Sequence, residues 1–176
     1  MKQLNFLGAP KSAAGQDAKK LQPESLKFEI FVDGASRGNP GAAGVGIYCK
    51  KNGTTFFKQG FFIGFGTNNF AEYAALLCAL FLLKAKLENV EKPLLNVYSD
   101  SQLLVYQING LYKTKNPMIK IFMQRMRKLL QHFSWSVIHI PREKNAMADA
   151  LANQGLDEKI ELSPELKKLI NPNLPD

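Results

Sequence analysis

The stretch FVDGASRGNPGAAGVGIY, residues 31–48, decides the fold class of this chain. Residues 27–32 have the composition of a buried strand, and this strand is followed directly by Asp33 and a series of glycines. Glycine clusters after strands often bind phosphate, but this one lacks the Gly-x-Gly-x-x-Gly spacing and no helix pattern follows it. Residues 44–50 form a second strand pattern instead. The stretch therefore predicts two consecutive strands, with an acid at the end of the first.

The rest of the chain extends this pattern into an α/β fold. Asn52 and Gly53 tolerate positive φ and favour a tight hairpin from the second strand into a third at residues 54–62. Further strands are expected at 94–98 and 134–140, and helices at 70–88, 101–109, 117–132 and 145–155. Consecutive strands followed by crossover helices predict a mixed five-stranded sheet flanked by helices.

Composition indicates a single globular domain with a polyanionic partner. The chain has 176 residues, 45% of them hydrophobic, and carries 23 basic against 15 acidic residues. The net charge of +8 favours nucleic acid as the partner, then an anionic membrane surface, with a merely soluble basic protein as the alternative. No apolar run reaches the roughly 20 residues of a membrane span. No signal-peptide pattern is present and the two cysteines read as reduced core residues, so we expect a cytoplasmic monomer.

Three segments are expected along the chain. Residues 1–26 have no sustained periodicity and predict a flexible basic arm. Residues 27–156 contain all the strands and most of the helices, and predict the functional domain. Residues 157–176 contain three prolines and predict a short helix followed by disorder.

Four carboxylates lie at the ends of predicted elements: Asp33, Glu72, Asp100 and Asp149. Each has a local explanation. Asp33 with Gly34 fits a turn, Glu72 fits a capping box three residues after Asn69, and the other two fit helix N-termini. Taken together they predict more, because the first and fourth strands are plausible neighbours and each is followed by an acid. Converging carboxylates repel one another unless cations lie between them, and hard cations such as Mg²⁺ take oxygen ligands. The pattern fits two-metal phosphoryl chemistry.

Four motifs, VDGASRGNPGAAGVGIY, TNNFAEYAALLCAL, YSDSQL and PREKNAMADALAN, resemble those of type 1 ribonuclease H in order and spacing. The resemblance covers residues 28–155 and is closest to compact members that lack the basic handle helix. It implies the sheet order 3-2-1-4-5, with strand 2 antiparallel, and hydrolysis of the RNA strand of RNA–DNA hybrids to 5′-phosphate and 3′-hydroxyl ends. It also implies two Mg²⁺ ions, with Mn²⁺ as a substitute, held by Asp33, Glu72, Asp100 and Asp149.

The resemblance also implies contacts to the substrate. The family positions near the sugar-phosphate backbone correspond here to Gly34, Ala35, Ser36, Asn39, Asn68 and Asn69. In place of a handle, the candidates for phosphate contacts are Lys113, Lys115 and Asn116, although Asn116 also fits a helix cap. Lys120, Arg125, Arg127 and Lys128 are expected to be ordinary surface charges. The loop after the fifth strand lacks the histidine found in many members, and Arg142 or Glu143 is the candidate to take part of its role.

Two other functions remain open at this point. One is a binding module that holds hybrids or duplex RNA without cutting them. The other is a different nuclease on the same fold, an exonuclease or a junction resolvase, although these lack the Asn-Pro-Gly turn and the TNNFAE helix entry seen here. Duplex RNA and RNA–DNA junctions also remain open as additional substrates.

Overall fold

A five-stranded sheet in the order β3-β2-β1-β4-β5 organises the chain. The computed structural model describes residues 26–87, 91–171 and 173, so residues 1–25 of the predicted arm (1–26) lie outside it, as do residues 172 and 174–176 of the predicted tail. The elements are β1 (Lys27–Gly38), β2 (Gly41–Lys51), β3 (Thr54–Gly66), α1 (Asn68–Ala85), β4 (Leu94–Ser99), α2 (Gln102–Ile108), α3 (Pro117–Leu130), β5 (Ser134–His139), the 3-10 turn η1 (Arg142–Lys144), α4 (Ala146–Asp157) and α5 (Pro164–Ile170). Strand β2 is antiparallel to both neighbours, while β1, β4 and β5 are parallel. The predicted fold class and sheet order are confirmed.

The glycine-rich stretch at residues 31–48 forms a long hairpin and not a loop. Strand β1 continues through Gly38, and its pairing with β2 runs without interruption from Phe28 to the Gly38–Gly41 pair. The expectation that Asp33 ends the first strand was therefore wrong. The pairing of β1 with β4, however, stops at Phe31, which lies opposite Tyr98. Asp33 consequently lies where β1 leaves β4, and this separation opens the edge of the sheet at which a site can form.

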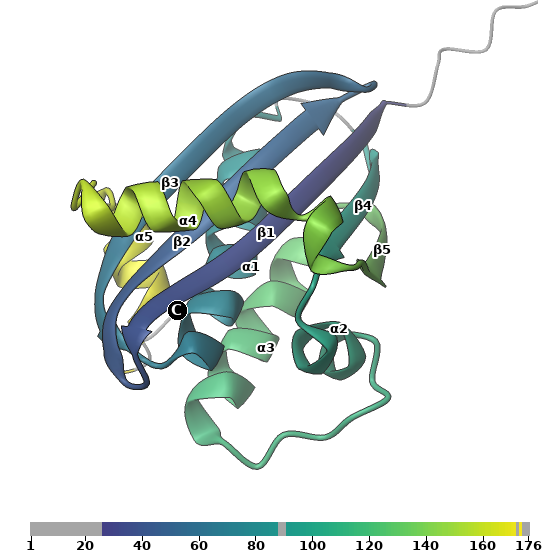
Figure 1. Cartoon of the computed structure of the whole chain (residues 1–176). Coiled ribbons are helices and arrows are strands. Elements are labelled where there is room, and N and C mark those ends of the chain that lie inside the picture. The colour runs from purple at the N-terminus through teal and green to yellow at the C-terminus, as the bar shows by residue number, and fades with distance from the viewer. Residues whose placement is uncertain (1–25, 88–90, 172, 174–176) are drawn as a thin grey trace, which may run out of the picture.

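Helices cover both faces of the sheet. Helix α4 crosses one face over β1, β2 and β3, while α1 packs on the other face with α3 and α5 beside it (Figure 1). The α4 helix lies directly on the sheet backbone, because a Cβ atom at Gly46 would overlap the carbonyl oxygen of Ala148. Gly155, expected to end this helix, lies inside it and faces the backbone of Phe61 at similarly close range. In the part of the chain described, no helix combines the length and apolar character needed to cross a bilayer.

The segment after α4 contributes to the same hydrophobic core. Leu162, Leu166 and Ile170 are buried together with the side chains of α1 and α3. Arg125 on α3 is only 6% exposed, so the expectation of a surface charge was wrong. Its guanidinium Nη1 donates to the carbonyl oxygens of Leu169 (2.6 Å) and Asn171 (2.9 Å). The last carbonyls of a helix lack partners within the helix, and Arg125 supplies donors to them at the end of α5.

Arg125→Met is expected to lower the free energy of unfolding by about 2 kcal/mol, because two carbonyl oxygens lose charge-assisted hydrogen bonds. Urea denaturation followed by circular dichroism measures the change. Arg127→Met, two residues away on the exposed side of α3, is the matched control and is expected to shift stability by less than about 0.5 kcal/mol. Equal stability of the two variants would refute the anchoring role of Arg125.

Candidate active site

Four carboxylates from four different elements converge where β1 and β4 separate. Asp33 lies in β1, Glu72 in α1, Asp100 directly after β4, and Asp149 in the first turn of α4. All four are partly exposed. The negative charges of Asp100, Asp149 and Glu72 each act on Asp33. The structure thus brings together the four acids that the sequence singled out.

Burial is the main reason that the pKa of Asp33 rises to about 7, from an ordinary value of 3.8. The charge of Asp100 raises it further, a backbone hydrogen bond at Gly34 lowers it, and Asp149 and Glu72 add smaller increases. Burial also raises the pKa of Glu72, an effect that a hydrogen bond from Ser101 partly offsets. Asp33 and Glu72 are therefore carboxyl groups whose ionisation is disfavoured by burial, and at Asp33 the charges of the three other acids add to this effect.

Glu72 is oriented by a short chain of polar groups. Its Oε1 accepts from Asn68 Nδ2 (3.2 Å) and its Oε2 accepts from the Ser101 hydroxyl (2.6 Å). The Asn68 backbone N–H in turn donates to Asn39 Oδ1 (3.2 Å) in the β1–β2 turn. Asn39 and Asn68, predicted as substrate contacts, are thus joined to one another and to Glu72. Ser101 was not singled out by the sequence, which offered Asp100 as the cap of this helix; the structure has Ser101 as the cap of α2.

Asn145 makes the connection between β1, β4 and α4. The sequence predicts it as the cap of α4, yet its side chain makes no cap hydrogen bond and is only 1% exposed. Its Nδ2 donates instead to Asp100 Oδ1 (2.7 Å) and to the carbonyl oxygen of Val32 (2.9 Å). Asn145 Oδ1 is buried without a hydrogen-bond partner. The residue holds the Asp100 carboxylate against the strand that carries Asp33.

Asn145→Ala is expected to reduce kcat by about 10- to 100-fold, because the Asp100 carboxylate loses the donor that fixes its orientation. It is also expected to cost about 1–3 kcal/mol of stability, since the Val32 carbonyl stays buried without that donor. Steady-state kinetics and thermal unfolding measure the two effects. Asn153→Ala, on the same helix, is the control for loss of an asparagine side chain; its Nδ2 donates only to the Asp149 carbonyl oxygen of its own helix. An unchanged kcat in Asn145→Ala would refute the positioning role.

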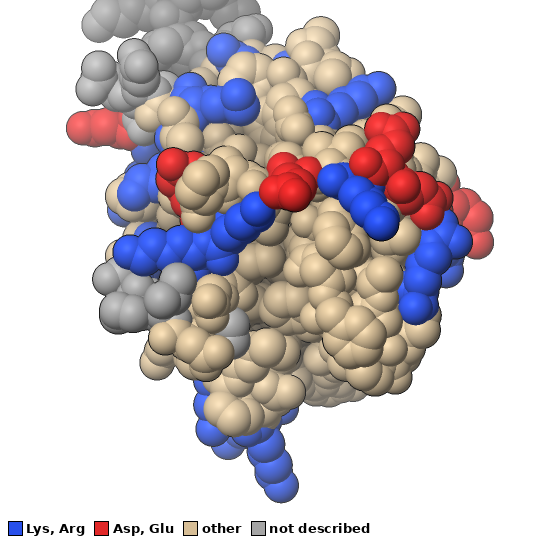
Figure 2. Space-filling view, turned by 90° about the vertical axis from the view of Figure 1, so that its left-hand side faces the viewer, with Lys and Arg blue, Asp and Glu red and all other residues tan. Residues whose placement is uncertain are grey.

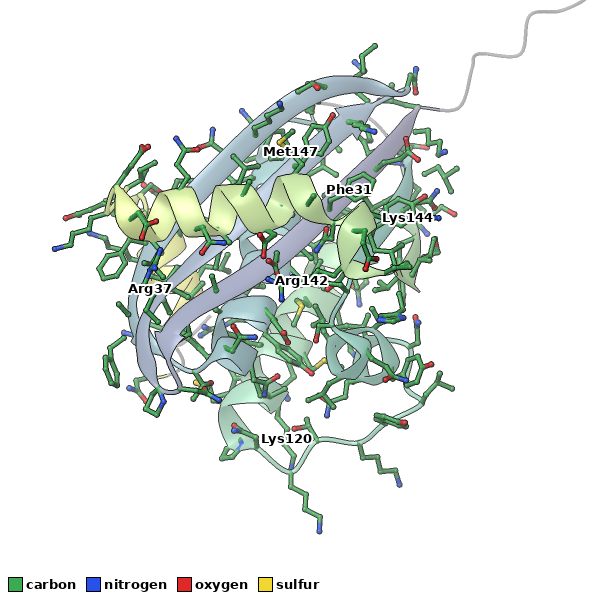
Figure 3. The ribbon with its side chains drawn as sticks, in the orientation of Figure 1. Phe31, Arg37, Lys120, Arg142, Lys144 and Met147 are labelled. Carbon is green, nitrogen blue, oxygen red and sulfur yellow. The ribbon has the colours of Figure 1, made fainter. Side chains whose placement is uncertain are left out.

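Arg142 places a positive charge beside the converging carboxylates. Its Nη2 lies 2.8 Å from Asp149 Oδ1, and Figure 3 shows it beside β1 below the first turn of α4. The hydrogen bond to Asp149, its charge, and the charges of Asp33 and Asp100 raise the pKa of Arg142. A cavity of about 260 Å³ lies here, lined by Arg142, Glu143, Ala146 and Asp149. His139 Nε2 lies 3.2 Å from the carbonyl oxygen of Asp100, so it contacts the backbone of an acid and not its carboxylate.

The donor set suits a hard divalent cation. The converging groups are carboxylate oxygens, the ligands that Mg²⁺ and Mn²⁺ take in proteins, and the charges of the other three acids add to burial in raising the pKa of Asp33. Within the described residues, no three His, Cys, Asp or Glu side chains form a ready-made metal cage. Three of the acids accept hydrogen bonds from protein side chains. Arg142 donates to Asp149, Asn145 donates to Asp100, and both Ser101 and Asn68 donate to Glu72.

Other predicted contact residues have structural partners in the fold. Gly34 is in close contact with α1, because an added Cβ would overlap the Glu72 backbone nitrogen. The Ser36 hydroxyl donates to the carbonyl oxygens of Gly66 (3.0 Å) and Gly38. Ala35, between them, pairs with Gly44 of β2. These residues fasten β1 to its neighbours, which fixes the backbone beside Asp33.

The remaining predicted contacts lie at helix starts and in the α2–α3 connection. Thr67 caps α1, not Asn69 as the sequence suggested, and Asn69 Oδ1 is buried without a hydrogen-bond partner. Asn116 does cap α3, through its side chain to the N–H groups of Met118 and Ile119. Lys113 and Lys115 are exposed in the connection between α2 and α3.

Comparison with known proteins agrees with this architecture. A family model described as "Reverse transcriptase-like" matches residues 31–155. Ribonuclease HI of Halobacterium salinarum is 41% identical over 142 residues, which are 78% of this chain and 69% of that protein. The crystal structure of RNase H1 from this archaeon superposes with a TM-score of 0.69 at 40% identity, over 75% of this chain and 98% of the other.

A second solved structure contains nucleic acid. LC11-RNase H1 in complex with an RNA/DNA hybrid superposes with a TM-score of 0.68 at 39% identity, covering 74% of this chain and 97% of that one. The sheet order, the four converging carboxylates and these identities lead to one conclusion. The chain belongs to the type 1 ribonuclease H family, and it is an enzyme of that family.

Proposed function

We propose that this enzyme is a metal-dependent endoribonuclease that hydrolyses the RNA strand of RNA–DNA hybrids. The observation that carries the proposal is the coupling of Asp33 to Asp100, Asp149 and Glu72, which leaves negative charge for cations to neutralise. The hybrid bound to LC11-RNase H1, a relative at 39% identity, supports the choice of substrate. Ribonucleases H of lower identity, such as that of Legionella pneumophila at 31%, support the same reaction class.

In this proposal the four acids hold two Mg²⁺ ions, with Mn²⁺ as a substitute. Asp33 would contact both ions, Asp149 the ion on the side of the attacking water, and Glu72 with Asp100 the ion on the side of the leaving 3′-oxygen. The bound ions would supply charge neutralisation and a more acidic water. Asn145 orients the carboxylate of Asp100, and Ser101 orients that of Glu72. The ion pair of Arg142 with Asp149 would have to break for Asp149 to hold a cation. The products would carry 5′-phosphate and 3′-hydroxyl ends.

Recognition of RNA would depend on the 2′-hydroxyl groups, which an A-like helix displays in its wide minor groove. The candidate contacts are the backbone around Gly34, Ala35 and Ser36, which follow Asp33 in β1, and the amides of Asn39, Asn68 and Asn69. The hydrogen bonds from Asn39 to Asn68 and from Asn68 to Glu72 support this assignment. Through them, a substrate contact at the turn would be coupled to the position of a metal ligand.

End-labelled hybrid, RNA duplex and DNA duplex of one sequence, each with Mg²⁺, Mn²⁺ or EDTA, test the proposal. Internal cleavage of only the RNA strand of the hybrid, dependent on metal, is the expected result. Binding of hybrid with no cleavage under any metal would favour the idle binding module. Products shortened stepwise from one end would favour an exonuclease. The duplex RNA lane decides whether the substrate range is broader.

Segment boundaries and cellular setting belong to the same proposal. We assign the activity to residues 27–156, with α5 of the following tail packed onto their core. A monomer in the cytoplasm is the expected form. Both cysteines, Cys49 and Cys78, are free and buried, in agreement with the reduced state expected there.

A further inference from the structure

The positive charge of the chain is concentrated in one segment. Residues 101–142 contain seven of the 23 basic residues and none of the 15 acidic ones, which leaves 16 basic and 15 acidic residues elsewhere. Within the segment Arg142 is paired with Asp149, and outside it basic side chains often lie next to acidic ones. Figure 2 shows this on the side at the left of Figure 1, and Arg37 with Asp157 and Lys167 with Glu161 are ion pairs of this kind. The net charge of +8 is therefore a local property of the segment that carries α2 and α3.

A groove lies between α3 and the α2–α3 connection. It has a volume of about 390 Å³, and its lining includes Lys113, Thr114, Lys120, Gln124 and Arg127 but no acidic residue. Lys120, Gln124 and Arg127 follow one another at helical spacing on the exposed side of α3, while Phe122 and Met126 face the core. Lys120 and Arg127 are exposed, as expected of surface charges, and both line this groove. We call these lining residues the α3 groove.

The wall of the α3 groove is anchored to the core. Gln107 is buried, accepts a hydrogen bond from the Tyr73 hydroxyl, and donates from Nε2 to the Lys113 carbonyl oxygen (3.5 Å). Tyr112 packs edge-on against Tyr106 with ring centroids 5.1 Å apart. Tyr73 directly follows Glu72 in α1. The groove is consequently fixed in position relative to the acidic cluster, although Lys120 lies at the far end of α3 from Arg142 (Figure 3).

We propose that the α3 groove binds backbone phosphates of the duplex at a point separate from the acidic cluster. This inference rests on the proposed function and adds a second point of contact to it. Lys113, Lys120 and Arg127 supply positive charge without a neighbouring carboxylate in the lining, while Thr114 and Gln124 supply neutral donors. The ligand is the phosphodiester backbone, and either strand of the hybrid carries that chemistry.

Lys120→Ala/Arg127→Ala in the full chain tests the α3 groove, with Lys58→Ala/Lys84→Ala, two exposed lysines elsewhere, as the control for lost charge. Hybrid binding is measured in EDTA over a range of salt concentrations, so that cleavage plays no part. At about 0.1 M salt we expect the groove variant to bind about tenfold or more weakly, and its slope of log K against log salt to fall by nearly two. Lys120→Gln/Arg127→Gln, which keeps the side-chain length, is expected to repeat the result. Equal losses in the groove and control variants, or no loss, would overturn the proposal.

Uncharged methylphosphonate linkages in one strand at a time identify the strand. If the groove holds the DNA strand, neutral DNA linkages weaken wild-type binding and have little further effect on the groove variant. The same coupling with neutral RNA linkages would assign the RNA strand. Absence of coupling with both strands refutes the groove. The proposed cleavage can fail independently of the groove. If the coupling is seen in EDTA but wild type never cuts RNA with Mg²⁺ or Mn²⁺, the groove stands and only the proposed cleavage is contradicted.

Discussion

Asp33→Asn is expected to lower hybrid cleavage by at least about 1000-fold with either Mg²⁺ or Mn²⁺, while hybrid binding in EDTA stays within about twofold of wild type. Asp33 is the acid on which the charges of the other three act. An amide keeps the shape of the side chain but removes the charge that would hold cations. The loss would therefore appear in kcat, and neither metal would restore it.

The same substitution is expected to stabilise the metal-free protein at neutral pH. The pKa of Asp33 is about 7 in the folded chain, against an ordinary 3.8, so the contribution of its protonated form to stability is fully present below about pH 4 and lost as the pH rises through 7. Solvent screening reduces the effect to about 2 kcal/mol, which corresponds to about 4–8 °C in Tm for a chain of this size. Wild type without metal is expected to lose stability between pH 4 and 7, and Asp33→Asn is expected to lose much less.

Thermal unfolding in EDTA and with Mg²⁺, at several pH values, measures these shifts. Asp157→Asn is the matched control, because Asp157 is an exposed carboxylate paired with Arg37. It is expected to leave cleavage unchanged. Activity of Asp33→Asn near the wild-type level would remove the assignment of the acidic cluster as the catalytic site, and an identical pH dependence of Tm would contradict the raised pKa.

Gly34→Ala is expected to lower the free energy of unfolding by about 3 kcal/mol and to reduce kcat by more than about 100-fold in the fraction that folds. The new Cβ would overlap the Glu72 nitrogen and the Ala71 carbonyl carbon, so α1 must move away from β1. This movement would separate Glu72 from Asp33. A displacement of about 1 Å is enough to lose about two orders of magnitude in rate.

Urea denaturation and kinetics at saturating hybrid separate the two effects of Gly34→Ala. Ala42→Val, which enlarges an exposed residue on the neighbouring strand β2, is the control and is expected to change little. A folded Gly34→Ala protein with wild-type kcat would show that the distance between β1 and α1 does not set the position of Glu72.

The sheet could be predicted from the sequence because its signals are local. The Asn52-Gly53 turn, the alternation in the strands and the long apolar helix each depend on neighbouring residues, and the sheet order followed from the family resemblance. Strand ends were harder to predict. β1 continues past Asp33 because Gly38 and Gly41 pair across a hairpin, and glycine-rich extended chain has the same composition as a loop.

The side chains that donate hydrogen bonds to the acids could not be predicted from the sequence. Asn145 and Ser101 have the spacing of helix caps, and nothing local distinguishes a cap from a side chain that reaches Asp100 or Glu72 on another element. Arg125 shows the same limit, because its burial depends on carbonyl groups more than 40 positions later in the chain.

The close contact between α4 and Gly46 has a consequence for how related chains diverge. The height of Asp149 above the sheet depends on position 46 having no side chain, although Gly46 carries no reactive group. A methyl group added at position 46 would push α4, which carries Asp149, away from the sheet. All four acids would still be present in the sequence. Related chains can therefore lose their activity and still look complete in a motif search. Position 46 would be the place to look in such a chain.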